Sequence, residues 1–138
     1  MLTKNQTRLS WALQLLVAVI LGQTLFFKFT AAPESVYIFE TLGAEPWGRI
    51  GSGVAELVAI ALILAPWRPL YGALLTMAVM AGAIGSHLTK LGIVVQDDGG
   101  TLFAMALITF AAAATVAVLR RSEVGTTIRS ARSEVAAT

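Results

Sequence analysis

The sequence predicts an all-α membrane protein: a membrane-embedded four-helix bundle with a short amphipathic outer segment between the first and second helices. Of the 138 residues, 57% are hydrophobic and only 13% are charged, whereas a soluble domain carries charges at about a quarter of its positions. The mean hydropathy is +0.77, and the charged residues are gathered between long apolar runs. One small soluble core could not bury so much apolar surface, so lipid must surround the helices.

Four apolar runs are long enough to cross a hydrocarbon core about 30 Å thick, which needs about 20 helical residues. The predicted spans form one transmembrane domain, residues 1–119, and cover approximately residues 9–29, 50–65, 70–88 and 101–119. A signal peptide is the alternative for the first span, but the run is too long for one and Lys28 interrupts its end. We therefore expect the first helix to stay in the mature protein.

The segments that connect the spans also predict local structure. Pro66, Trp67, Arg68 and Pro69 predict a tight interfacial turn, because proline cannot continue the helical hydrogen bonds. The second and third spans should therefore form an antiparallel hairpin. Small residues spaced four apart should allow helix backbones to approach closely, and they are Gly51, Ala55 and Ala59 with Ala78, Gly82 and Ser86.

The connection between the first two spans, residues 30–48, predicts a short helix that lies along the membrane surface. Pro33 and Glu34 suit a first helical turn, and Gly43 is a natural C-terminal stop. The apolar contacts would come from Val36, Tyr37, Ile38, Phe39 and Leu42. Such a segment either covers the outer mouth of the bundle as a lid or only lies in the interface.

The basic residues predict the orientation, because four spans place both termini on one side. That side would carry Lys4, Arg8, Arg68, Arg120, Arg121, Arg129 and Arg132, and the other side Lys28, Arg49 and Lys90. The positive-inside rule then predicts a multi-pass protein of the bacterial cytoplasmic (inner) membrane, with both termini in the cytoplasm. The basic tail, residues 120–138, has too few apolar residues to pack and is predicted to be disordered or loosely attached to anionic lipid.

Composition also limits the chemistry. The chain has no cysteine and one histidine, which excludes thiol redox chemistry and leaves no ordinary ligand set for zinc or copper, so no metal site is predicted. The basic residues flank spans or lie in the tail, and no basic face with interleaved aromatic residues remains for a nucleic acid. Lipid is the expected surrounding partner.

Glu56 is the strongest indication of a site. A carboxylate in the outer half of a span costs about 2.5 to 3.5 kcal/mol to insert, so it must face the bundle interior with a partner or take up a proton. Lys28 and His87 lie at a similar depth in the first and third spans, and these three are the candidate catalytic residues. The candidate cofactor-binding residues are Lys28, Glu56, Gln23, Ser52 and His87.

Each of these residues also has a structural interpretation. Lys28 and Glu56 could form an ion pair that only locks the first helix to the second. An imidazole at the position of His87 could bind water, a lipid headgroup or a backbone carbonyl. Gln14 and Gln23 are typical of interhelical hydrogen bonds.

Several short motifs occur together along residues 11–119: Gly22 with Lys28, the 39–43 stretch, Glu56 after Gly51 and Gly53, the turn at 66–69, and His87 late in the third span. In this arrangement the chain resembles the DoxX family of small four-helix bacterial membrane proteins. The resemblance implies membrane redox chemistry, since the family is named with subunits linked to quinone-dependent oxidation of sulfur compounds and to oxidative-stress assemblies. The resemblance also implies that Lys28 and Glu56 correspond to the polar pair of the family, and it includes His87.

The predicted function is a quinone-associated redox accessory subunit of a larger membrane complex. The helices would form a lipid-accessible cleft for an isoprenoid quinone, Lys28 or His87 would donate to a quinone oxygen, and Glu56 would take part in proton exchange. The chain offers no electron donor, so another membrane or peripheral redox subunit would carry a flavin, haem or other centre. The alternatives are a proton-coupled small-solute transporter or binding protein, completed by a homo-oligomer, and a structural membrane anchor without a ligand.

Overall fold

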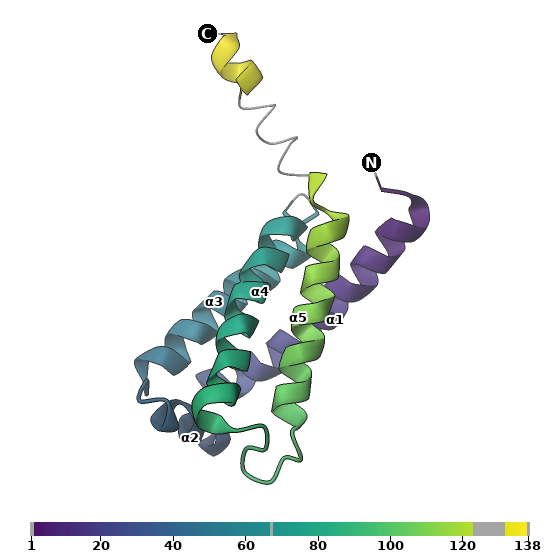
Figure 1. Cartoon of the computed structure of the whole chain (residues 1–138). Helices are drawn as coiled ribbons and strands as arrows, with labels where there is room; N and C mark the ends of the chain where they lie inside the picture. Colours follow the sequence, from purple (N-terminus) through teal and green to yellow (C-terminus); the bar gives the residue numbers. More distant parts are fainter. Residues whose placement is uncertain (1, 67, 123–131, 138) are drawn as a thin grey trace.

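The computed structural model describes residues 2–66, 68–122 and 132–137, and within these ranges the secondary structure is entirely helical. Its elements are α1 (Lys4–Phe29), α2 (Pro33–Thr41), α3 (Trp47–Leu64), α4 (Pro69–Ser86), the π-helix η1 (His87–Leu91) and α5 (Thr101–Leu119) (Figure 1). Helices α1, α3, α4 with η1, and α5 are long and apolar enough to cross a membrane. The predicted fold class, a four-helix membrane bundle with a short helix between the first two spans, is confirmed.

The helices begin and end at local sequence signals that a hydropathy profile does not detect. α1 begins before residue 9 because Thr3 caps it: the Thr3 hydroxyl accepts from the Gln6 amide at 3.2 Å, and the Gln6 side chain accepts from the Thr3 amide at 2.9 Å. This reciprocal capping box satisfies two amides at the helix start. α2 begins with Pro33 and is followed by Gly43, whose φ of +70° favours glycine.

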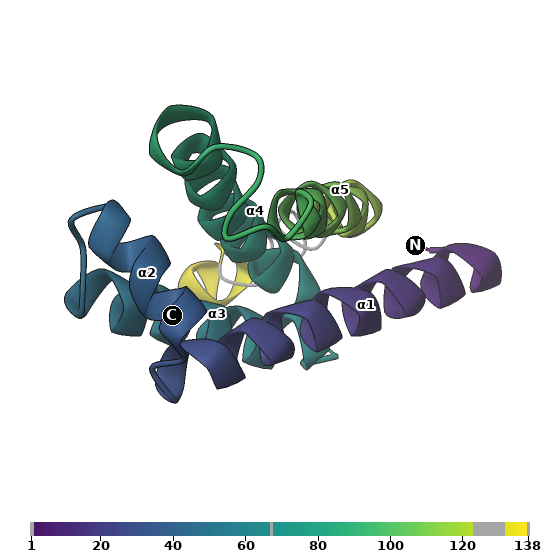
Figure 2. The ribbon, with the colours of Figure 1, turned by 90° about the horizontal axis from the view of Figure 1, so that it is seen from below.

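The four long helices form a ring in which α1 and α4 each pack against both α3 and α5. The core between them consists mainly of small and branched side chains, including Val17, Leu21, Ile63, Ala113 and Val116. Large apolar side chains such as Val19 and Leu107 are exposed, as lipid-facing positions require. Both chain termini lie at one end of the bundle, which we call the inner end, and α2 lies at the opposite, outer end (Figures 1 and 2).

The hairpin of α3 and α4 brings two helix backbones into contact. A Cβ atom added to Gly72 would lie 2.3 Å from the backbone nitrogen of Ile63, so the two backbones touch at this point. Pro69 supplies the first turn of α4. Of the predicted turn at residues 66–69, Trp67 lies outside the described residues.

A buried hydrogen-bond cluster joins three helices near the inner end. The Gln14 amide donates to the backbone oxygen of Ile63 at 2.6 Å, and Ser10 donates to the Gln14 oxygen at 2.6 Å. Arg120 in turn donates to Ser10 at 3.1 Å. The interhelical role predicted for Gln14 is therefore confirmed, whereas Arg120, which the sequence assigned to the tail, packs against the bundle.

The structure describes only part of the predicted tail, residues 120–138. Residues 123–131 and 138 lie outside the described residues, and residues 132–136 form a short, exposed helical segment. The disorder predicted for 120–138 therefore stays a prediction for the part of the tail that the structure does not describe.

Gly72→Ala should destabilise the protein, because the new methyl group has no room beside the backbone of Ile63. We expect a loss of about 1 to 3 kcal/mol in the free energy of unfolding, typical of overpacking. Thermal unfolding of the detergent-solubilised protein, followed by circular dichroism, measures it. Gly22→Ala is the matched control, since a Cβ atom there meets nothing within 4 Å and alanine favours the helix by about 1 kcal/mol. Equal stability of the two variants would contradict the close approach.

Candidate functional site: a cavity at the outer end

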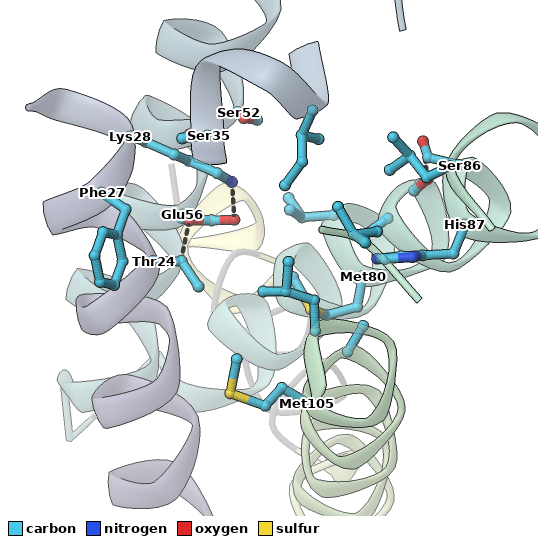
Figure 3. A pocket seen from close by; sticks show the side chains of 18 of the residues that line it. Thr24, Phe27, Lys28, Ser35, Ser52, Glu56, Met80, Ser86, His87 and Met105 are labelled. Carbon is cyan, nitrogen blue, oxygen red and sulfur yellow. Dashed lines mark hydrogen bonds and ion pairs between the residues drawn. The ribbon is translucent and has the colours of Figure 1, made fainter. Parts of the chain in front are cut away.

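A cavity of about 680 Å³ lies in the outer half of the bundle. Side chains from all five α-helices, from η1 and from the loop before α5 line it, and most of this wall is apolar (Figure 3). Helices α1 and α5 are tied at their inner ends by Arg120 and diverge toward the outer end, where the cavity lies (Figures 1 and 2). Cavities of this volume are typical of sites for small organic ligands, which occupy about 300 to 1,000 Å³.

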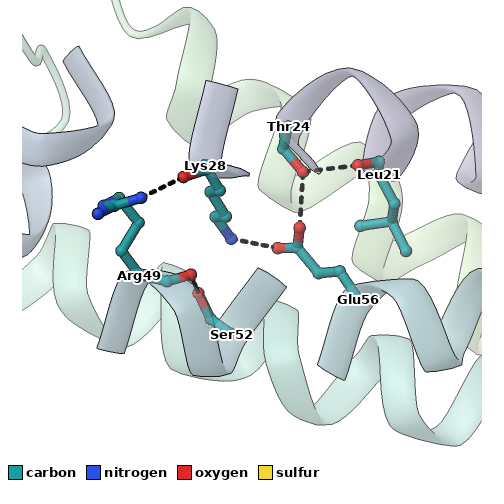
Figure 4. Close-up of polar contacts among 6 residues, drawn as sticks. All are labelled: Leu21, Thr24, Lys28, Arg49, Ser52 and Glu56. Atoms are coloured by element: carbon teal, nitrogen blue, oxygen red, sulfur yellow. Dashed lines mark hydrogen bonds and ion pairs between the residues drawn. The ribbon is translucent and has the colours of Figure 1, made fainter. Parts of the chain in front are cut away.

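An ion pair between α1 and α3 forms the polar part of one cavity wall. Lys28 Nζ lies 2.5 Å from Glu56 Oε1, and the two side chains are 15% and 2% exposed, respectively (Figure 4). An isolated carboxylate at this depth would be expensive to bury. The paired ammonium is therefore what allows Glu56 to remain inside an apolar bundle.

Thr24 completes the environment of Glu56. Its hydroxyl lies 2.7 Å from Glu56 Oε2 and 2.8 Å from the backbone oxygen of Leu21. A hydroxyl has one hydrogen but can also accept, so two arrangements fit these distances. Either Thr24 donates to an ionised Glu56, or a protonated Glu56 donates to Thr24, which then donates to Leu21. The hydrogen bonds can be satisfied in both protonation states of the carboxyl group.

Arg49 holds the end of α1 in place beside the ion pair. Its guanidinium donates to the backbone oxygen of Lys28, and its Nε lies 2.8 Å from Glu45 Oε1. A cation at a helix C-terminus also interacts favourably with the helix dipole. Ser52, one turn further along α3, donates to the backbone oxygen of Arg49 at 3.2 Å and lines the cavity. Arg49, Ser52 and Glu56 thus each bond to a different group.

Helix α2 covers the cavity at the outer end. The ring of Phe39 lies 5.7 Å from Lys28 Nζ, a distance at which the aromatic face attracts the cation. Ser35 is buried, and both residues line the cavity. α2 also contacts η1 on the other side of the bundle. Of the two predicted roles for this segment, the structure favours the lid.

His87 reaches the cavity from the outer end of α4. Its Nδ1 lies 2.8 Å from the backbone oxygen of Gly92, and its ring packs edge-to-face on Phe103 with centroids 5.5 Å apart. The side chain is buried and extends toward the cavity from a different side than Lys28 and Glu56 (Figure 3). Two contacts therefore fix the orientation of the imidazole.

Asp98 organises the loop that closes this end. Its carboxylate accepts from the amides of Gly100 at 2.8 Å and of Val95 and Leu102 at 3.0 Å, so it caps α5. Burial raises the pKa of Asp98, but these three amides and the nearby His87 outweigh that effect and hold the pKa below its ordinary value. The carboxylate therefore stabilises the fold above its unfolded pKa, and this contribution is lost as the pH falls through the lower folded value.

The cavity brings together four of the five predicted ligand-binding residues: Lys28, Ser52, Glu56 and His87. Gln23 is exposed and does not line the cavity. The sequence reasoning did not propose Ser35 and Asp98 for the site. The Asp98-Gly-Gly-Thr run before an apolar helix is a capping signal that could have indicated the latter, whereas Ser35 has no comparable signal.

A double-mutant cycle tests whether Lys28 and Glu56 act as one energetic unit. Lys28→Met and Glu56→Gln should each lower the free energy of unfolding by about 3 kcal/mol, because each leaves one buried charge without its partner. The double variant should recover much of that loss. Unfolding in mixed detergent micelles measures the energies. Additive effects of the two substitutions would show that the pair is not coupled.

Comparison of the chain with models of known protein families, with curated proteins and with solved structures finds no match.

Proposed function

We propose that this protein binds a lipophilic small molecule of the isoprenoid quinone class and acts as a quinone-associated accessory subunit of a membrane redox complex. The observation that carries the proposal is the outer cavity, whose largely apolar wall also contains Lys28, Glu56 and His87. A quinone has the matching character, since an apolar isoprenoid tail follows a ring with oxygens at opposite edges. The resemblance to the DoxX family supports the same class of ligand.

In this proposal, Lys28 and His87 supply the polar contacts to the ring. Lys28 Nζ carries three hydrogens, and the contact with Glu56 uses one of them. The ammonium can therefore also donate to a ring oxygen. His87 approaches from a different side of the cavity (Figure 3). Glu56 can exchange a proton near the ligand, because Thr24 supports both of its protonation states.

The redox centre itself belongs to a partner in this proposal. The side chains of this protein offer no electron donor, so the electrons would come from or go to a flavin, haem or other centre in a neighbouring subunit. A proton-coupled transporter or binding protein is the second candidate. The contact between Glu56 and Thr24 favours this candidate. The carboxyl group of Glu56 has hydrogen-bond partners both with and without a proton, and such a group is suited to proton exchange.

Retention of quinone during purification in mild detergent tests the proposal. The wild-type protein should retain quinone in stoichiometric amount, measured by extraction and mass spectrometry. Glu56→Gln and Lys28→Met should lower the retained amount several-fold, because each removes a polar contact inside a desolvated site. Gln23→Ala, exposed on α1 and outside the cavity, is the control and should retain as much as wild type.

The double variant Lys28→Met/Glu56→Gln separates ligand binding from stability. It removes both charges together, so it should be more stable than either single variant and still lose quinone. Wild-type protein that is folded and free of quinone after extraction from quinone-containing membranes would contradict the proposal. Proton-dependent solute uptake by proteoliposomes would instead favour the transporter.

We further propose that the protein resides in the bacterial cytoplasmic membrane with both termini in the cytoplasm. The inner end carries exposed cations such as Lys4, Arg8 and Arg121. At the outer end, Lys28 and Arg49 are engaged with Glu56 and Glu45. The positive-inside rule therefore favours the inner end as the cytoplasmic side.

Labelling of single cysteines tests this orientation, and the cysteine-free chain provides a clean background. Glu40→Cys, on the exposed side of α2, should react with a membrane-impermeant maleimide on intact spheroplasts. Ala136→Cys, in the exposed C-terminal segment, should react only after permeabilisation. The reverse pattern would invert the topology.

A further inference from the structure

We propose that the outer cavity prefers the hydroxyl form of its ligand, the quinol, over the carbonyl form, the quinone, and that His87 sets this preference. The inference rests on the proposed function and specifies which redox form the site recognises. The preference follows from the position of the hydrogen on the imidazole ring, which the fold places on Nδ1.

Nδ1 of His87 lies 2.8 Å from the backbone oxygen of Gly92. A carbonyl oxygen can only accept a hydrogen bond, so Nδ1 must carry a hydrogen. This contact is built into the chain, because η1 ends at Leu91 and Gly92 follows it with a φ of +77°. The positive φ that glycine adopts readily turns the chain where its oxygen meets the ring.

Nε2 lies at the far edge of the same ring. In a neutral imidazole with hydrogen on Nδ1, Nε2 presents a lone pair and can only accept. Among the residues that the structure describes, Nε2 has no hydrogen-bond partner. The ring extends into the cavity (Figure 3), so Nε2 can accept from a donor on a ligand that fills it.

The two forms of the ligand differ in what they present to Nε2. A quinol hydroxyl donates to Nε2, whereas a quinone oxygen would place its lone pairs against the lone pair of Nε2. Lys28 can donate to the second oxygen in either form, so it does not distinguish them. A site that pairs with a hydroxyl disfavours the analogue that lacks it, because the bound analogue excludes water from Nε2 and leaves this nitrogen without a partner.

The experiment measures the dissociation constants of a decyl-tailed ubiquinone analogue in its oxidised and reduced forms. The purified protein is titrated without oxygen at about pH 8, above the range in which imidazole ordinarily takes up a proton. Affinity is read from the rise in thermal unfolding temperature with ligand concentration. The wild type should bind the reduced form about tenfold more tightly, the upper range for one net hydrogen bond.

His87→Phe and His87→Leu should reduce the two affinities to within about twofold of each other, because neither side chain has a hydrogen-bond acceptor. Two variants are used so that one remains informative if the other is unstable. Thr89→Ala is the matched control on η1: its hydroxyl donates to the backbone oxygen of Gly85 at 2.7 Å, and it is exposed and outside the cavity. It should keep the wild-type preference.

The outcomes separate the two proposals. Equal binding of both forms by the wild type, or a preference that survives in either His87 variant, overturns the role of His87 and leaves quinone binding in place. Binding of neither form overturns the proposed function and this inference with it.

Discussion

The ion pair of Lys28 and Glu56 is the contact on which the outer half of the bundle depends. A carboxylate inside an apolar bundle needs a fixed partner, and here that partner stands at the end of the neighbouring helix. The same lysine also engages Arg49 through its backbone oxygen and Phe39 through its ammonium. Lys28 therefore joins the end of α1 to Glu56 and Arg49 of α3 and to the covering helix α2.

The two ends of α4 show why the cavity lies where it does. Near the inner end, Gly72 brings the backbones of α3 and α4 into contact, and no side chain could be inserted there. Near the outer end, a Cβ atom added to Gly82 would meet nothing within 4 Å, and Gly82 lines the cavity. Small residues thus close the bundle at one end and leave space within it at the other.

The sequence determined the spans because lipid imposes length and apolar character on any crossing helix. It also placed Lys28, Glu56 and His87 at one depth, since helical rise converts position into height. It could not predict how each helix is rotated. Gln23 and Thr24 differ by one residue, about 100° around the helix, and only Thr24 meets Glu56. Likewise, no local pattern indicated that Arg120 would bind Ser10.

That bond between Arg120 and Ser10 joins residues 110 positions apart, in the first span and just after the last. Its consequence concerns the order of assembly during synthesis. Until α5 has entered the bilayer, Ser10 and Gln14 lack their contacts to Arg120, and α1 has no neighbour on that side. A chain interrupted after α4 would therefore present polar side chains to lipid or to a quality-control protease. The final span completes the structure as well as the topology.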